Sequence, residues 1–227
     1  GGTLIDVNAT NNGAAYLIKN IDSLSGDKDL NCLCNFDVRF YGPAGGDQFS
    51  GTGTNGGSIK LINVDNGSYG NDLLVAARIA DVNAKTDTGA VYLFKNIDSL
   101  SGLIAASAAD VFWNGGAAAD RLAGGLLPAG EVMQFLNIDN GAYANDLILT
   151  AKDADANGRL DNGAIYLIKN IDSLSGRKDL ALSASYDVRW TGNGDSDLLG
   201  QSDNSGQPVQ LVNVDNGSYA NDLLIAN

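Results

Sequence analysis

Histidine is absent from the 227-residue sequence, and only one of its 27 acidic residues, Glu131, is a glutamate. Histidine is the most common general base and a frequent ligand of transition metals, so the usual residue for both roles is missing. Glutamate favours helix interiors, whereas aspartate favours turns and helix caps. The carboxylates of this chain therefore belong mainly to loops.

Cysteine is almost absent, since the only two cysteines are Cys32 and Cys34 in the tripeptide C-L-C. On a strand both side chains would point to the same face, too close in sequence for an unstrained disulfide. We expect two small, semi-buried side chains, and the alternative is a redox or metal-binding role.

Basic residues are also scarce, because 14 of them face 27 acidic residues and leave a formal net charge of −13. This charge disfavours nucleic acid and anionic membranes as partners and favours the binding of cations. No apolar run reaches the roughly 18 residues of a membrane-spanning helix, so we expect no membrane insertion. The composition, 44% hydrophobic and 18% charged, is that of a folded globular protein.

Internal repetition is the strongest signal that is present. The segment "GAAYLIKNIDSLSG" at 13–26 returns at 89–102 and 163–176, at intervals of 76 and 74 residues. Two further markers recur in the same order: "FDVRFYG" at 36–42 returns at 109–115 and 186–192, and "SIKLINVDN" at 58–66 returns at 132–140 and 208–216. The chain therefore holds three units of about 75 residues.

Each unit predicts an all-β structure of four short strands, of the types "KLINVD", "DLLVAA", "AVYLFKN" and "DVRF", with "IDSLSG" adding a short helical turn. The second and third runs are apolar almost throughout, which predicts a sheet covered on both faces. We expect one repeat domain, 1–227. It divides into an N-terminal part-unit 1–57, two units at 58–131 and 132–207, and a C-terminal part-unit 208–227.

The two part-units complement each other. The C-terminal "NDLLIAN" followed by the N-terminal "GGTLIDVNATNNGAAYLIKN" would read like the internal segment 71–96. Residues 208–227 are therefore expected to be completed by residues 1–57 of the same chain, which closes a ring, or by a neighbouring chain, which builds a larger ring or a filament. An open sheet edge invites pairing, so we expect one of the two arrangements.

The units resemble the FG-GAP repeats of integrin-α-type β-propellers. The correspondence lies in "NVDNGSYGNDLLVAA" at 63–77, "GAVYLF" at 89–94, and "DQFSG" and "DRLAG" at 47–51 and 120–124. The resemblance implies propeller-like, four-stranded blades, calcium in the loop between the first two strands, an extracellular or cell-surface location, and a role in adhesion. Three units are fewer than the four to eight blades of typical propellers.

The hairpin loop of each unit, which begins at Asn63 in the first full unit, is a candidate calcium site. Asn63 and Asp65 alternate around a glycine turn, Gly67 and Tyr69 can offer carbonyl groups, and Asn71 or Asp72 closes the loop. Glycine stands at 67, 141 and 217 where the family pattern has aspartate, so we expect weak binding, with Kd of about 10⁻⁴–10⁻³ M. The alternative is a plain Asn-Gly hairpin turn. The candidate ligands are Asn63, Asp65, Asp72, Asn137, Asp139, Asp146, Asn213, Asp215 and Asp222.

A second loop follows each "DLL" strand. In one unit it reads "DADANGRLD", with oxygen-bearing side chains at positions 1, 3, 5 and 9 and glycine at 6, like the front of an EF-hand loop without its final glutamate. The candidate ligands here are Asp153, Asp155, Asn157 and Asp161, with Asp81, Asn83 and Asp87 as a poorer copy.

The expected function is that of a calcium-binding structural or adhesive protein that assembles end to end, with self-association or an extracellular protein or glycan as the partner. No enzymatic activity is expected, because the chain offers no singular pair of acid and base. A carbohydrate-binding module is the alternative, with Phe40, Trp113 and Trp190 as repeated aromatic contacts; burial within the units is the other interpretation of these three.

Overall fold

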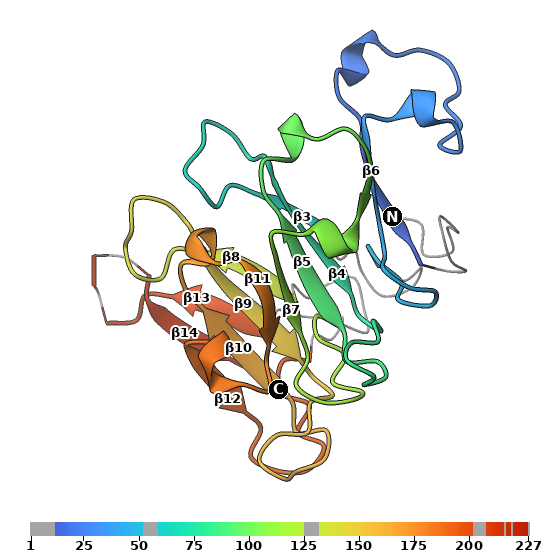
Figure 1. Ribbon diagram of the computed structural model, residues 1–227. Helices are drawn as coiled ribbons and strands as arrows, with labels where there is room; N and C mark the ends of the chain where they lie inside the picture. The colour runs from blue at the N-terminus through green and yellow to red at the C-terminus, as the bar shows by residue number, and fades with distance from the viewer. Residues whose placement is uncertain are drawn as a thin grey trace.

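The computed structural model describes residues 12–51, 59–124, 132–201 and 208–226, except Asn216 and Tyr219. Fourteen strands in four sheets make this part of the chain all-β, which confirms the predicted class (Figure 1). The expected unit boundaries at 57–58, 131–132 and 207–208 involve residues outside the described ranges. The strands are β1 (Ala14–Leu17), β2 (Val38–Tyr41), β3 (Ile59–Ile62), β4 (Asp72–Ala77), β5 (Ala90–Phe94), β6 (Gly102–Ala105), β7 (Val111–Asn114), β8 (Met133–Leu136), β9 (Asp146–Ala151), β10 (Ala164–Ile168), β11 (Gly176–Asp179), β12 (Val188–Thr191), β13 (Val209–Val212) and β14 (Asp222–Ile225).

Six short 3-10 helices lie between strands in the described ranges. Three of them are the predicted turns of the "IDS" segments, and each follows a left-handed asparagine. The 3-10 helices are η1 (Ile21–Ser23), η2 (Leu33–Asn35), η3 (Ile97–Ser99), η4 (Ala106–Ala108), η5 (Ile171–Ser173) and η6 (Ser183–Ser185).

The sheets follow the repeat. The first sheet has the order β1-β2-β6, the second β11-β7-β5-β4-β3, the third β12-β10-β9-β8, and the C-terminal hairpin consists of β13 and β14. Within the second and third sheets, four strands of one unit form an antiparallel arrangement in sequence order, β3-β4-β5-β7 and β8-β9-β10-β12, and β6 and β11 leave it for another sheet.

Two strands cross from one unit to the sheet of the unit before it. β6 pairs in parallel with β2, and β11 pairs in parallel with β7. Each crossing strand begins at a glycine with positive φ, +77° at Gly102 and +67° at Gly176. The amide of Gly102 donates to the Asp37 carbonyl (2.8 Å), and the amide of Gly176 donates to the Asp110 carbonyl (2.7 Å). Neighbouring units are therefore interleaved rather than merely packed.

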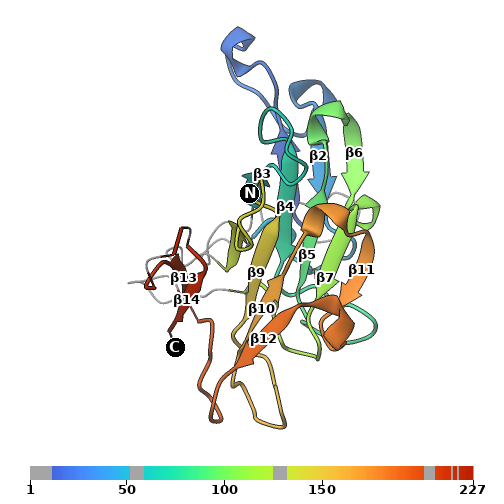
Figure 2. The same ribbon diagram turned by 90° about the vertical axis from the view of Figure 1, so that its left-hand side faces the viewer.

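The second sheet is buried on both faces, as predicted from its continuous apolar runs. Val75 and Tyr92 face the first sheet, while Leu74, Leu93 and Trp113 face the third sheet. Every residue of β4 and β5 is buried. The sheets therefore stack face to face with a hydrophobic layer between each pair (Figure 2).

The stack is open in the described part of the chain. The first sheet and the C-terminal hairpin lie at opposite ends of it (Figure 1), and no closed ring joins them among the described residues. The predicted propeller closure and number of blades remain predictions.

The cysteines differ from expectation. Cys32 and Cys34 form a disulfide at the exposed end of a loop. The expectation of two unpaired, semi-buried side chains is wrong, because the 3-10 turn η2 places Cys34 beside Cys32 rather than on an extended strand. Along the described parts of the chain, no helix has the length and apolar character needed to cross a membrane.

Candidate functional site

The loop between β3 and β4 is folded by its own side chains. The Gly67 amide donates to Asn63 Oδ1 (3.0 Å) and Asp65 Oδ1 (3.2 Å), and Asn63 Nδ2 donates to the Gly67 carbonyl (2.7 Å). Short amide and carboxylate side chains form such turns readily because they reach their own backbone. The same bonds recur at Asn137, Asp139 and Gly141 and at Asn213, Asp215 and Gly217.

Oxygen atoms converge beside this loop. The point where a β-carbon on Gly67 would lie is 3.6 Å from Asn63 Oδ1, 3.3 Å from Asp65 Oδ1 and 3.8 Å from Asn71 Oδ1. In the next copy, the same point on Gly141 is 3.7 Å from Asn137 Oδ1, 3.1 Å from Asp139 Oδ1 and 3.6 Å from the Tyr143 carbonyl oxygen. Each cluster thus combines one carboxylate with amide or carbonyl oxygens, a set that suits calcium.

In each of these two internal loops, one asparagine oxygen lacks a hydrogen-bond partner. Asn145 is only 8% exposed, and its Nδ2 donates to Asn170 Oδ1 (3.1 Å) and Asp172 Oδ1 (3.0 Å). Its Oδ1 is buried and accepts no hydrogen bond, and the same holds for Asn71 Oδ1 in the preceding copy. A buried acceptor left unpaired costs about 1–3 kcal/mol, so a bound cation or water would stabilise both loops.

Asp72 lies outside the oxygen cluster. Its Oδ2 accepts from the Val64 amide (2.7 Å) and its Oδ1 from the Asn96 amide (2.8 Å), and the residue is fully buried. Asp146 repeats both bonds, and Asp222 repeats the bond to the loop amide. The carboxylates of Asp72, Asp146 and Asp222 thus tie the loop to neighbouring backbone amides, and the prediction that they bind calcium stays a prediction. In the two internal loops, the asparagine one position earlier, Asn71 or Asn145, supplies the free oxygen.

A second carboxylate supports each internal loop from η3 or η5. Asp98 accepts from Asn71 Nδ2 (3.0 Å) and from the Tyr69 hydroxyl (3.0 Å). These hydrogen bonds, chiefly the one from Asn71, lower the pKa of Asp98. The hydrogen bond between the Tyr69 hydroxyl and Asp98 raises the pKa of Tyr69. Asp172 accepts the equivalent bonds from Asn145 and Tyr143. The loop side chains are thus held in place before any ligand binds.

The second loop, 153–161, does not gather its predicted ligands. Asp153 forms an ion pair with Lys152 and lies 3.4 Å from Arg121 NH1. Asp155 Oδ1 accepts from the Asp161 amide (2.7 Å), while Asn157 Nδ2 donates to Thr191 (3.0 Å). A cationic group therefore contacts Asp153, and a backbone amide donates to Asp155.

The poorer copy of that loop behaves alike. Asp81 Oδ1 accepts from the Asp87 amide (2.8 Å), Asp87 lies 4.0 Å from Arg121 NH2, and Asn83 accepts from Arg177. In the hairpin loops, by comparison, the oxygens of several predicted ligands lie side by side around Gly67 and Gly141.

The three repeated aromatic residues lie in or beside the hydrophobic layers. Phe40 and Trp113 are 1% and 0% exposed, so neither can stack on a sugar in this arrangement. Trp190 is partly buried and packs against the core between the third sheet and the C-terminal hairpin. For Phe40 and Trp113 the burial favours core packing over carbohydrate contact.

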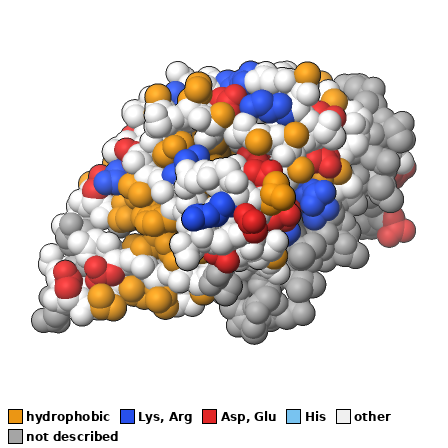
Figure 3. Space-filling view, turned by 90° about the horizontal axis from the view of Figure 1, so that it is seen from below, with side chains coloured by type: hydrophobic (Ala, Val, Ile, Leu, Met, Phe, Trp, Pro, Cys, Tyr) orange, Lys and Arg blue, Asp and Glu red, His pale blue; other side chains and the backbone are white. Residues whose placement is uncertain are grey.

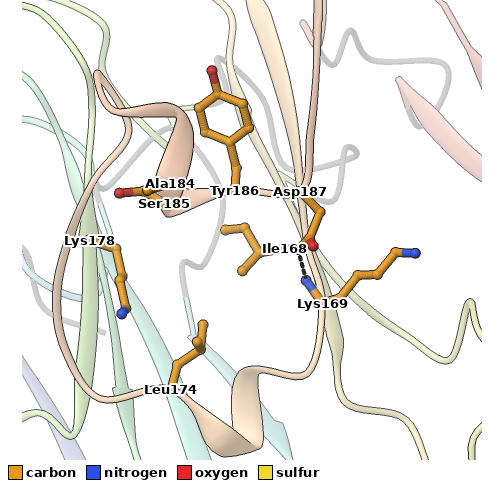
Figure 4. A pocket seen from close by; sticks show the side chains of 8 residues that line it. All are labelled: Ile168, Lys169, Leu174, Lys178, Ala184, Ser185, Tyr186 and Asp187. Carbon is orange, nitrogen blue, oxygen red and sulfur yellow. Dashed lines mark hydrogen bonds between the residues drawn. The ribbon is translucent and has the colours of Figure 1, made fainter.

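Two small hollows lie at equivalent places in the first and third units. Ile168, Lys169 and Tyr186 line one of about 190 Å³, in which the Lys169 amide donates to Asp187 Oδ2 (2.7 Å) and the Lys169 ammonium points outward (Figure 4). The other, of about 260 Å³, has Lys19 and Phe36 in its wall. Both are smaller than the roughly 300–1,000 Å³ of most small-molecule sites.

Comparison with known proteins does not assign this chain to a family. Neither the protein-family models nor the curated proteins contain a match to this chain. In the described ranges no three or more Cys, His, Asp or Glu side chains are grouped to hold a metal. A cation at the hairpin loops would therefore depend on one carboxylate together with amide and carbonyl oxygens.

Proposed function

We propose that this chain is an extracellular or cell-surface structural and adhesive repeat protein, stiffened by calcium at its hairpin loops and assembled end to end. The observation that carries the proposal is the buried, unpartnered oxygen of Asn71, which lies in the same cluster as the oxygens of Asn63 and Asp65. Asn145 has an equally unpartnered oxygen in the next copy of the loop. A plain hairpin turn accounts for the loop hydrogen bonds but leaves these two oxygens unsatisfied.

Calcium would be held by residues that already serve the fold. In the loop after β8 these are Asn137, Asp139, Asn145 and the Tyr143 carbonyl. A bound calcium ion supplies positive charge that offsets the repulsion among these oxygens. The residues themselves keep the β8–β9 hairpin in register with η5 through Asp172. The role is mechanical rather than chemical.

Two further features support the location and the role. A disulfide such as Cys32–Cys34 persists in oxidising compartments, which include the cell exterior. The β3–β4, β8–β9 and β13–β14 loops project from the same side of the stack in sequence order (Figure 1). Repeated, aligned loops suit a scaffold, and the FG-GAP resemblance implies the same use.

Calcium titration of thermal unfolding tests the proposal. At about 10 mM calcium and a Kd of about 10⁻⁴–10⁻³ M, each occupied loop should add about 1–3 kcal/mol to the free energy of unfolding. Asp139→Asn should keep the turn, because an amide oxygen can still accept from Gly141, and should lose part of this gain.

The matched control is Asp187→Asn, an exposed carboxylate outside both kinds of loop. It should respond to calcium like the unaltered protein. Identical unfolding curves in calcium and in chelator, for all three proteins, would refute calcium binding at these loops.

A further inference from the structure

The N-terminal unit exposes a side chain that the other units bury. Ile21 in η1 is 71% exposed, whereas the equivalent Ile97 and Ile171 are 4% and 0% exposed. Those two are covered because their 3-10 helix docks on a hairpin loop: the Ile97 amide donates to the Asn71 carbonyl (2.7 Å), and Ile171 repeats the bond with Asn145. η1 has the same sequence, but among the described residues no such loop belongs to its own sheet.

The C-terminal hairpin carries the loop that η1 lacks, and it exposes the complementary surface. β14 pairs only with β13 among the described strands, whereas the equivalent β4 and β9 each pair on both sides. Leu224 in β14 is 58% exposed, while its equivalents Leu74 and Ile148 are 0% and 1% exposed. Figure 3 shows hydrophobic side chains gathered toward this end of the molecule.

Besides β14, a second edge strand has no partner on one side among the described strands: β12 of the third sheet. β2 and β7 each receive a parallel strand from the next unit, but β12 receives none among the described strands, and Val188 is 37% exposed where Val38 and Val111 are fully buried. The segment that should fill such an edge exists at residues 26–29, where it forms no strand. Gly26 has φ +67°, the value of Gly176 at the start of β11.

We propose that a second copy of this chain docks through these surfaces, which deepens the proposed end-to-end assembly and rests on it. β14 of one copy pairs in antiparallel fashion with β1 of the next, completing a sheet of the order β13-β14-β1-β2-β6. Residues 26–29 of that next copy pair in parallel with β12 of the first copy. One contact thus adds one complete interleaved unit.

The internal sheets fix the register. Because Leu74 faces Leu93 and Val75 faces Tyr92 in the second sheet, Leu224 should face Leu17 and Ile225 should face Tyr16 across the contact. Because Phe112 faces Arg177 on the parallel edge, Arg189 should face Asp27. These two oppositely charged side chains would lie directly across the new strand pair, which stabilises it.

The occupant is a second copy because this chain itself carries the segments that would complete both edges. β1 pairs with β2 on one side and has no described partner on the other, and residues 26–29 form no strand. The two complementary surfaces lie at opposite ends of the open stack (Figure 1), so one molecule presents both without using both on itself. The contact joins different surfaces of the two copies and leaves one of each free. Such a contact continues into a filament when its rotation does not close.

Sedimentation of the 227-residue chain over a wide concentration range gives the primary test. The mass should grow with concentration in steps of 23.5 kDa without a preferred final size. Ile21→Asp should block one end and Leu224→Asp the other, so each variant alone should remain monomeric. Leu160→Asp, which replaces an exposed leucine (66%) in the β9–β10 loop rather than in a pairing strand, should associate like the unaltered chain.

Mixing the two blocked variants makes the test directional. One intact end remains on each, so an equimolar mixture should form a dimer and stop there. A mixture that stays monomeric overturns the proposal. Continued growth of either variant alone also overturns it. Both substituted residues are largely exposed in a single chain, and unfolding curves close to that of the unaltered chain would confirm that both variants remain folded.

Cysteine pairing tests the register. Leu17→Cys mixed with Leu224→Cys should give an oxidised, cross-linked dimer, whereas Leu17→Cys mixed with Leu223→Cys should not, because adjacent strand residues point to opposite faces. Equal cross-linking in both mixtures would overturn the proposed pairing. A cross-link within single chains carrying both Leu17→Cys and Leu224→Cys would overturn it in favour of a closed ring.

The calcium proposal is tested separately on the monomeric Leu224→Asp variant. Stabilisation of this variant by calcium, combined with failure of the blocked variants to dimerise, would overturn the docking alone. Filaments formed by Leu224→Asp would show assembly through another surface and would again overturn only the docking. Dimerisation without any calcium effect would refute the calcium-binding role and leave the docking intact.

Discussion

Asp120 is a carboxylate kept from water by the turn that follows β7. It is 3% exposed, and its Oδ2 accepts from the Ala117 amide (2.8 Å). Burial raises the pKa of Asp120 to about 6, with a smaller contribution from the nearby charge of Asp155. Asp47, at the equivalent place one unit earlier, has its pKa raised to about 6 by burial as well. At neutral pH both carboxyl groups are therefore largely ionised, and the burial of these charges lowers the stability of the folded chain.

The shift predicts a particular pH dependence. With a folded pKa of about 6 against an ordinary value of 3.8, Asp120 binds more protons in the folded than in the unfolded chain between these values. Its contribution to stability therefore improves as pH falls from about 7 to about 4, by roughly 2 kcal/mol. Asp120→Asn should remove this gain, and urea unfolding at several pH values would measure it.

The control for this experiment is Asp195→Asn, an exposed carboxylate that accepts from the Leu160 amide (3.1 Å). The comparison of variants isolates Asp120, because carboxylates such as Asp98, whose pKa is lowered, act in the opposite direction in every protein tested. An Asp120→Asn protein with an unchanged pH profile would contradict the prediction.

At the residue scale, the sequence indicates that Asn63 and Asp65 share one side of the loop, and their oxygens lie together beside Gly67. Asn63 and Asp65 alternate, and alternation around a tight turn indicates which side chains share a side. The choice between Asn71 and Asp72 is harder, since neighbouring residues at a strand start point to opposite faces. Which of them faces the loop depends on where β4 begins, and a sequence pattern places element boundaries less reliably than the elements themselves. The structure gives the inner position to Asp72 and the loop position to Asn71.

At the scale of elements, a close approach of two backbones connects β10 to the turn after β12. Gly163, just before β10, has φ +76°, and a β-carbon there would lie 2.3 Å from the amide nitrogen and the carbonyl oxygen of Leu199. No side chain fits at that distance. Gly89 meets Leu122 in the same way in the second sheet.

Gly163→Ala should therefore be strongly destabilising, by more than about 3 kcal/mol, because the two segments must move apart. Gly158→Ala is the matched control, since Gly158 has the same φ of +76° but nothing within 4 Å of its added methyl group. It should cost only the left-handed backbone penalty of about 1 kcal/mol. Similar urea midpoints for the two variants would contradict the steric argument.

The consecutive strands of each unit were predictable, whereas the crossing strands β6 and β11 were not. The continuous apolar residues of "DLLVAA" and "AVYLF" predict buried strands, and these segments form the buried strands β4 and β5. β11 reads Gly-Arg-Lys-Asp, with no pattern of its own, and it becomes a strand only because β7 of the preceding unit offers an edge. Pairing between segments far apart in the sequence leaves no recognisable pattern in the residues of the crossing strand itself.

For the whole molecule, the repeat predicts the number and order of sheets better than their curvature. Apolar runs indicate that sheets are covered on both faces, which the second sheet confirms. Whether successive sheets turn far enough to meet depends on small rotations at each interface. No residue pattern encodes that rotation directly, so the ring predicted by resemblance and the open stack share the same local sequence.

Net charge should govern the association of whole molecules. Each chain carries −13, so two copies repel each other at low ionic strength. Raising the salt concentration to about 0.15 M shortens the screening length to about 8 Å and should strengthen association, measured by sedimentation. Leu224→Asp should stay monomeric at every salt concentration. Weakening of the association by salt would contradict this prediction and point to ion pairs such as Arg189–Asp27 as the dominant contacts.

The crossing strands also bear on how such a protein can change its length. An internal unit gives one strand to its predecessor and accepts one from its successor, so duplication of a unit in the gene restores every interface that it interrupts. A closed propeller fixes its number of blades through curvature, but an open, interleaved stack has no such limit. Lengthening or shortening by whole units would therefore leave the pairing of the remaining internal units unchanged.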